Sequence, residues 1–498
     1  MKPPVRCREH GTDASRWKVS NASGDMPDRG RSSVRGAKWG IMGLPPWDDR
    51  MSEAGTLPER RTAGEIAQPG CTMTGFLFLL AEIEGDHAVV VFGERDCANA
   101  FPRIMPFTKR RPWNVFSVSL SQIDAVAGSA EERLADCLRA VAISRRPRAI
   151  LVLGTCLSDM IGADPQPACR RVQDETGIRI VWVPTSGLQP RTQAQTVDWM
   201  VRTLLTELGE DGVRDPDGVN LVGYQTGADV PWTEERMAFR EEVVDLLARM
   251  GLRLNAAAPS GATMADWTGL PRAALTAVSD RAVFGSLMDL LESSGQASVE
   301  LPQPKGISAT DAFYLGLARA AGRDATDILQ AYEGRAAAVL ATAGARMRWA
   351  GRRLAYGIGS HHNFRSDQLA QEGLADLPLL LELGFRIDLV IQERDTSEGH
   401  QRIQRNLAAM SVDLPYRFFA EPAALAPVLE AGGYDLVYLS SFLRGQAVRV
   451  GIPMVEMGRF PSGYRGASES CRILERAGTP VFERRFGRWS GGRKGEGA

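Results

Sequence analysis

Short apolar runs that end at a glycine or a turn alternate with amphipathic stretches in the first part of the chain. The apolar runs are typical of buried strands and lie at 88–92, 115–119, 149–153 and 178–183. Amphipathic stretches at 130–142 and 195–208 have helical periodicity. This alternation predicts a parallel sheet with helices on both of its faces.

The same alternation occurs twice more along the chain. Further strand patterns lie at 219–224, 273–278, 353–362, 385–392 and 436–439. We therefore expect three Rossmann-like α/β domains, each a doubly wound parallel sheet, at 66–212, 213–335 and 336–498, the last with a C-terminal return. A Pro-rich break at 300–306 separates the second unit from a helix that Thr310 or Asp311 is expected to cap.

Residues 1–65 are predicted to form a mobile N-terminal extension. They are rich in Arg, Gly, Ser, Asp and Pro and have little apolar periodicity. Such a segment buries too little apolar surface to offset the entropy of ordering it, so it is expected to be mobile or to wrap a partner. Met51 is an alternative start, which leaves open whether residues 1–50 belong to the native protein.

Composition excludes several classes of protein. The chain has 498 residues, 44% hydrophobic and 24% charged, which is typical of a soluble globular protein. Its 59 Lys and Arg against 60 Asp and Glu leave no electrostatic footprint for nucleic acid. No apolar run reaches the roughly 18 residues of a membrane span. The odd count of 7 Cys favours a reducing compartment, so we expect a cytoplasmic protein.

Three cysteines lie where apolar elements break at glycine. Cys71 follows Gly70, Cys97 follows the run 88–92 and a turn from Gly93, and Cys156 follows the run 149–153 and Gly154. The carboxyl ends of parallel strands meet at one edge of a sheet, so these thiols can converge there. Cys137 and Cys169 lie within amphipathic helical patterns and are interpreted as structural.

Converging thiolates favour an iron–sulfur cluster. Such clusters are usually held by four Cys thiolates, so three imply a fourth ligand from elsewhere in the chain or from a partner. The alternative is that the three are buried structural thiols, because free cysteine is among the most buried residue types. The loop His361-His362 is a weaker metal candidate, because no other ligand lies at a suitable spacing.

The motifs around these cysteines resemble one family. Gly-Glu-Arg-Asp-Cys97 and Gly-Thr-Cys156-Leu-Ser-Asp-Met-Ile-Gly-Ala-Asp, together with Cys71-Thr-Met-Thr-Gly, resemble the three cysteine motifs of nitrogenase component 1 and its relatives. The segments Pro304-Lys-Gly-Ile-Ser and Ser462-Gly-Tyr-Arg-Gly resemble the same superfamily. The resemblance spans about residues 66 to 480. It implies three doubly wound domains with the cluster on the first.

The resemblance also implies a role. The catalytic subunit of nitrogenase holds its cofactor through a second-domain Cys and a third-domain His, but 275–284 has no Cys here and 455–464 has no His. A β-type subunit is the better match. It implies Cys71, Cys97 and Cys156 as metal ligands, Ser186 as an extra ligand or neighbour, and Gly70, Gly93 and Gly154 as clearance for the cluster.

Partners and substrate are implied only by the same resemblance. The cluster, [4Fe-4S] or P-cluster-like [8Fe-7S], would lie at the interface with a homologous α-type subunit in an α2β2 heterotetramer. An ATP-dependent iron protein would supply the electrons, since this chain has no Gly-x-x-x-x-Gly-Lys-Ser/Thr loop of its own. Methylthio-alkane reduction is the first interpretation. (Proto)chlorophyllide reduction, a cofactor-assembly scaffold and a non-catalytic interaction protein remain open.

Overall fold

The fold can be followed in most of the chain. The computed structural model describes residues 72–80, 83, 85–104, 114–121, 124, 127–188, 193–226, 235–359 and 373–477. The N-terminal extension, Cys71 and the pair His361-His362 lie outside these residues, so the predictions made for them stay predictions.

The first sheet is parallel, with strand order β2-β1-β3-β4. Its strands are β1 (His87–Gly93), β2 (Val115–Ser119), β3 (Ala149–Gly154) and β4 (Arg179–Val183). Its two faces belong to two separate cores. Val89 and Val91 join the core that contains α2 (Thr72–Leu80) and α8 (Gln193–Leu208), whereas Val90 joins the core of α5 (Ala130–Arg145) and α7 (Gln166–Thr176). Burial on both faces explains why the central strands β1 and β3 read as continuous apolar runs.

The second sheet is also parallel, with strand order β6-β5-β7-β8. Its strands are β5 (Asp215–Val222), β6 (Arg253–Ala258), β7 (Ala273–Val278) and β8 (Ala297–Glu300). The helices of this part are α9 (Glu235–Arg249), α10 (Met264–Gly269), α11 (Arg281–Ser293), α12 (Ile307–Ala320) and α13 (Thr326–Gln330).

The third sheet has five parallel strands in the order β11-β10-β9-β12-β13. They are β9 (Arg353–Gly359), β10 (Arg386–Gln392), β11 (Tyr416–Phe419), β12 (Leu436–Leu439) and β13 (Met454–Glu456). Its helices are α14 (Glu333–Trp349), α16 (Leu377–Glu382), α17 (Ser397–Ala409), α18 (Leu425–Gly432), α19 (Arg444–Val450) and α20 (Gly463–Ala477). Three parallel sheets with helices confirm the predicted fold class.

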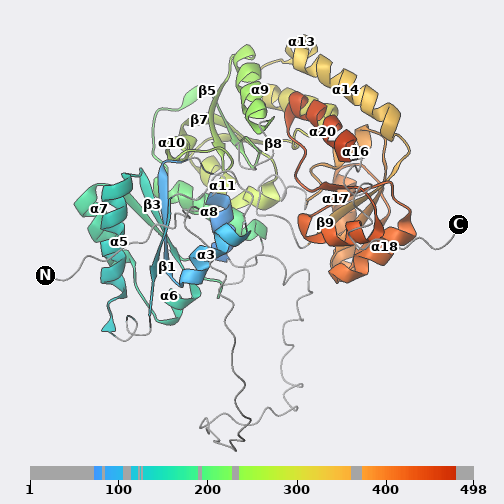
Figure 1. Cartoon of the computed structure of the whole chain (residues 1–498). Coiled ribbons are helices and arrows are strands. Elements are labelled where there is room, and N and C mark those ends of the chain that lie inside the picture. The colour runs from blue at the N-terminus through green and yellow to red at the C-terminus, as the bar shows by residue number, and fades with distance from the viewer. Residues whose placement is uncertain are drawn as a thin grey trace, which may run out of the picture. The chain divides into compact units, whose positions relative to one another are not determined.

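The last helix returns from the third sheet toward the second. Helix α20 packs against α14 and also against α9 and α12 (Figure 1). The carboxylate of Glu242 on α9 accepts hydrogen bonds from the backbone N–H groups of Tyr464 and Arg465, at 3.0 and 3.1 Å. It therefore satisfies two of the amides that the start of α20 leaves without a helical partner. Glu242 thus links the start of α20 to α9.

A second carboxylate connects a helix of the third sheet to a helix of the second sheet. Glu382 on α16 accepts hydrogen bonds from the backbone N–H of Ile307 at 2.7 Å and of Ser308 at 3.3 Å, at the start of α12. The expected cap at Thr310 is wrong, because the helix begins three residues earlier, and the Thr310 hydroxyl donates to the Gly306 carbonyl inside it. Glu382, which is distant in sequence, therefore caps the helix in place of the local residue that the sequence pattern indicated.

The segment between β8 and α12 is also tied to the third sheet. Lys305, only 1% exposed, lies with its ammonium 3.5 Å from the carboxylate of Asp376, which is equally buried. The Lys305 ammonium also donates to the Phe460 carbonyl. The Pro304-Lys305-Gly306 motif singled out by resemblance is thus a buried contact between the second and third sheets.

Candidate functional site

Two of the predicted ligands lie at one edge of the first sheet. Strands β1 and β3 are adjacent, and Phe92 at the end of β1 pairs with Gly154 at the end of β3. Cys97 follows β1 in the first turn of α3 (Arg95–Ile104), and Cys156 is the first residue of α6 (Cys156–Met160) (Figure 1). Both thiols are half-buried. The predicted placement of these two cysteines at neighbouring strand ends is therefore what the structure has.

The third predicted ligand cannot be placed. Cys71 lies outside the described residues, although α2 begins at the next residue, Thr72, and packs against α3, which carries Cys97. Within the part of the chain that the structure describes, no group of three or more His, Cys, Asp or Glu is suited to hold a metal ion. A set that needs Cys71 is not tested by that observation, so the three-cysteine site remains a proposal.

Ser186 lies at the same edge, one strand further along. It follows β4, the neighbour of β3, and is 1% exposed. Its hydroxyl oxygen accepts a hydrogen bond from the backbone N–H of Leu188 at 3.2 Å. The preceding Thr185 donates to the Gly154 carbonyl at 2.7 Å, which fixes this loop to the end of β3. Ser186 is thus a neighbour of the Cys156 segment, and its oxygen already has a backbone partner.

Two glycines at this edge make room for protein side chains. Gly93 has φ +134°, and a Cβ there would overlap the Thr155 hydroxyl. A Cβ at Gly154 would lie 2.5 Å from the ring of Trp182. The clearance expected at these glycines is therefore used by Thr155 and Trp182, which pack the sheet edge behind the two cysteines.

The other described cysteines are set apart by burial. Cys137 and Cys169 lie in the apolar core under α5 and α7, and burial raises the pKa of the Cys169 thiol to about 12. Since the thiolate is the form that binds metal, burial disfavours such a role for Cys169. These positions agree with the structural interpretation made for both.

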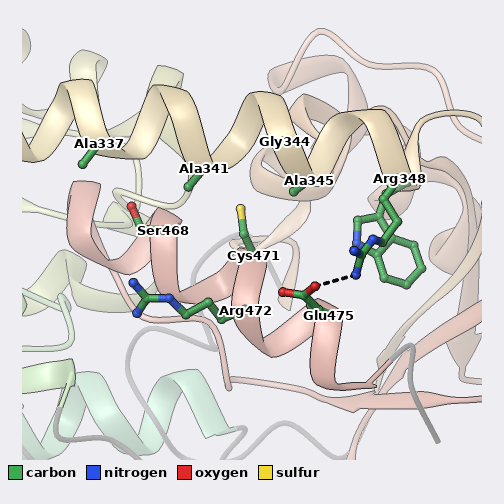
Figure 2. A pocket seen from close by; sticks show the side chains of 10 residues that line it. Ala337, Ala341, Gly344, Ala345, Arg348, Ser468, Cys471, Arg472 and Glu475 are labelled. Carbon is green, nitrogen blue, oxygen red and sulfur yellow. Dashed lines mark hydrogen bonds and ion pairs between the residues drawn. The ribbon is translucent and has the colours of Figure 1, made fainter.

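Cys471 belongs to a different place in the fold. It lines a hollow of about 430 Å³ between α14 and α20, where Figure 2 shows its thiol pointing toward α14 at the small residues Ala341, Gly344 and Ala345. Arg348 and Glu475, 2.7 Å apart, form an ion pair at one end. Burial raises the pKa of the Cys471 thiol. Among the residues that the structure describes, no other cysteine or histidine lines this hollow.

Apolar side chains are exposed beside the cysteines. Met160, in the helix that Cys156 begins, is 74% exposed, and Leu188, two residues after Ser186, is 57% exposed. The Glu94, Arg95 and Asp96 side chains before Cys97 are exposed as well. An edge that shows large apolar groups next to half-buried thiols is suited to being covered by another surface.

An aromatic ring is buried at the end of the stretch 275–284, which has no cysteine. Phe284 is fully buried on α11, and its ring occupies the space that a Cβ at Gly223 would need. The backbone of α11 is not helical at Phe284, with φ −116° and ψ 23°. The carboxyl end of β5, where Gly223 lies, is thus closed by protein atoms.

The donor set at the first sheet fits an iron–sulfur cluster in its chemistry. Cys97 and Cys156 would supply two soft ligands at adjacent strand ends, whereas the other described thiols are buried in helix packing. Sequence reasoning found these two cysteines but missed Thr155, whose side chain accepts from the backbone N–H of Glu94. The pattern Thr155-x-x-Ser158 ahead of a short helix is a capping signal that could have pointed to it.

The described helices can be compared in length and hydropathy with a membrane-spanning helix. None of them is both long enough and apolar enough to cross a bilayer.

Comparison with known proteins gives a family and a set of relatives. The family model described as nitrogenase component 1 type oxidoreductase matches residues 71–477. The nitrogenase iron-molybdenum cofactor biosynthesis protein NifE of Methanococcus maripaludis is 25% identical over 270 residues, 53% of this chain and 52% of that protein. NifE of Mesorhizobium japonicum is 25% identical over 165 residues, 32% of this chain and 30% of that protein. The chain spans about half the length, or less, of these curated relatives.

Solved structures agree on the fold. The structure described as nitrogenase Cp1 at pH 6.5 superposes with a TM-score of 0.64 and 17% identity, covering 83% of this chain and 93% of that chain. The same protein at pH 5 gives a TM-score of 0.63 and 14% identity, covering 86% and 90%. At these identities the likeness shows the fold alone.

Proposed function

Because the chain belongs to the nitrogenase component 1 type oxidoreductases, we propose that it is a β-type subunit of a two-component reductase. It binds an iron–sulfur cluster, [4Fe-4S] or P-cluster-like, at the contact with a homologous α-type subunit in an α2β2 assembly. Cys71, Cys97 and Cys156 are its ligands. The observation that carries the proposal is the pair Cys97 and Cys156 at the carboxyl ends of two adjacent parallel strands.

The chain's own part is to hold the cluster and shape its surroundings. When bound, such a cluster supplies one-electron transfer, with a potential that depends on charge, hydrogen bonds to sulfur and solvent access. Met160 and Leu188 provide apolar surface for the subunit contact. Electrons come from an ATP-dependent iron protein and pass to a substrate or cofactor site in or beside the partner. The proposed substrate is a methylthio-alkane, because the sequence departs from the tetrapyrrole reductases around Cys97 and retains all three cysteines.

Exchange of cysteines in the anaerobically purified complex tests this proposal. We expect Cys156→Ala to lose the cluster's iron and EPR signal, because a thiolate ligand is removed. Cys137→Ala is the matched control, since its thiol is buried in the core at 1% exposure, and it is expected to keep both. Equal iron loss in the two variants would contradict the ligand assignment. A stable iron-loaded chain without a partner would contradict the proposed place of the cluster at a subunit contact.

A second candidate is a cofactor-assembly scaffold. It is favoured by the names of the curated relatives, which are cofactor biosynthesis proteins. The two functions differ in the product that the complex releases. A reductase turns over a reducible substrate with the iron protein and ATP, whereas a scaffold releases a metal cofactor to an apo-acceptor without net substrate reduction. Measuring both with one preparation, against the Cys156→Ala complex as a blank, separates them.

A further inference from the structure

One side chain joins the segment that carries Cys97 to the segment that carries Cys156. Thr155 is 1% exposed and immediately precedes Cys156. Its hydroxyl oxygen accepts a hydrogen bond from the backbone N–H of Glu94 at 3.3 Å. It also accepts one from the backbone N–H of Ser158 at 3.5 Å, inside the first turn of α6. A single oxygen thus connects the start of α6 with the turn that leads into α3.

The end of β1 is shaped for this contact. Gly93 lies at φ +134°, a conformation that a side chain disfavours, and a Cβ there would overlap the Thr155 hydroxyl. The Gly93 carbonyl accepts from the backbone N–H of Leu120 at 2.8 Å, which holds this turn against the segment after β2. Glycine at position 93 therefore allows the close approach, and the neighbouring strands keep it in place.

The contact is close in sequence to both cysteines. Glu94 is three residues before Cys97, and Thr155 immediately precedes Cys156. We propose that Thr155 is a positioning residue that holds Cys97 and Cys156 in the arrangement an iron–sulfur cluster requires before the cluster arrives. The inference rests on the proposed function, since the ligand is the cluster. Groups that orient metal ligands in this way typically change metal affinity about 10- to 100-fold when they are removed.

The helix cap alone does not account for Thr155. Ser158 completes that cap from the other side, because its hydroxyl accepts from the Thr155 N–H at 2.9 Å and donates to the Thr155 carbonyl at 2.8 Å. These bonds stay within four residues of α6. The bond from Glu94 spans 61 positions and adds nothing to the helix. Its effect is confined to the relation between the two cysteine segments.

The test uses three variants of the full chain in its complex. Thr155→Val keeps the shape and removes the oxygen, and Thr155→Ser keeps the oxygen. Thr310→Val is the control, because Thr310 is equally buried and its hydroxyl bonds only to a carbonyl within its own helix. Two quantities are measured: amide hydrogen exchange of the peptide containing residues 94–97 after the iron is removed, and the rate at which a chelator takes iron from the loaded protein.

We expect Thr155→Val to speed hydrogen exchange at 94–97 and to speed iron loss about tenfold, whereas Thr155→Ser and Thr310→Val behave as the wild type. Exchange at 94–97 unchanged in Thr155→Val overturns the inference, and so does equal iron loss in Thr310→Val, which would indicate general destabilisation. If the wild type holds no iron, the proposed function fails, and the positioning role of Thr155 toward the cluster fails with it. Hydrogen exchange still decides separately whether Thr155 couples the two segments.

Discussion

Glu242 and Tyr464 are 222 positions apart, yet the carboxylate of Glu242 accepts the backbone N–H of Tyr464 at 3.0 Å. It also accepts the Tyr314 hydroxyl at 3.2 Å. Tyr464 in turn packs its ring against that of Tyr314, with centroids 6.0 Å apart. This carboxylate, fully removed from solvent, is the point at which the returning helix α20 attaches to the second sheet's helices.

This attachment predicts a pH dependence of stability. Desolvation by burial raises the pKa of Glu242 to about 7 from 4.5, against the opposing effect of its three hydrogen-bond donors and the Arg465 charge. Between those values the folded state binds a proton that the unfolded state has released. The free energy of unfolding therefore falls as the pH rises through this window, by about 3 kcal/mol in total.

Comparison of Glu242→Gln with the wild type isolates this effect in urea unfolding at pH 5 and pH 8. The variant should lack the fall. The comparison is needed because His87, whose pKa burial lowers to about 4, acts in the opposite direction: its contribution to stability rises with pH between about 4 and 6.5. Glu241→Gln, at an exposed neighbouring carboxylate, is the control and should follow the wild type. A pH profile shared by Glu242→Gln and the wild type contradicts the assignment.

Because Lys305 and Asp376 form a buried pair, substitutions at the two positions are expected to have non-additive effects on the free energy of unfolding. Asp376→Asn leaves the Lys305 ammonium buried without a counter-charge, which should lower the free energy of unfolding by about 3 kcal/mol. The double variant Lys305→Met with Asp376→Asn should recover part of that loss. Asp217→Asn breaks the exposed pair with Arg323 and should cost under about 1 kcal/mol. Strictly additive losses in the double variant would show that the two buried groups do not interact.

The close contact of Gly154 with Trp182 predicts that a side chain at position 154 would clash with the indole ring, and that a smaller ring at position 182 would relieve the clash. Gly154→Ala places a methyl 2.5 Å from the Trp182 Cη2 atom, so we expect a loss of about 1–3 kcal/mol in thermal or urea unfolding. Trp182→Phe removes that atom, and the double variant should be more stable than Gly154→Ala alone. Gly344→Ala, on a helix with open space around its Cα, is the control and should be neutral or slightly stabilising. Failure of Trp182→Phe to relieve the loss would place the strain elsewhere.

Arg95 is predicted to influence the potential of the proposed cluster. It is exposed at the start of α3, two residues before Cys97. Arg95→Ala removes a positive charge without touching a ligand, so the midpoint potential should become more negative while the iron content is unchanged. Potentiometric EPR on the complex measures this, with Arg170→Ala, an exposed arginine on α7, as the control. An unchanged potential would leave Arg95 as a solvated turn residue.

The sequence by itself determined the alternation of strands and helices and several of the strands. The strands expected at 115–119, 273–278 and 436–439 are those of the structure. The strands at 273–278 and 436–439 are buried at nearly every position, as a central strand of a parallel sheet requires, and the edge strand at 115–119 alternates between buried and partly buried residues. Both are local patterns. The boundary positions of Cys97 and Cys156 follow from the same pattern, since each comes directly after such a run.

Only the tertiary structure decided which side chains act across the sheets. Glu241 and Glu242 are adjacent acids on one helix, yet Glu241 is exposed and Glu242 is buried at the start of α20. Thr155 meets Glu94 because β1 and β3 are neighbours, and Glu382 replaces the expected Thr310 cap because α16 packs beside α12. A periodic pattern shows which face of an element is buried. It does not show which distant amide or charge that face meets, because that depends on how the sheets and helices pack.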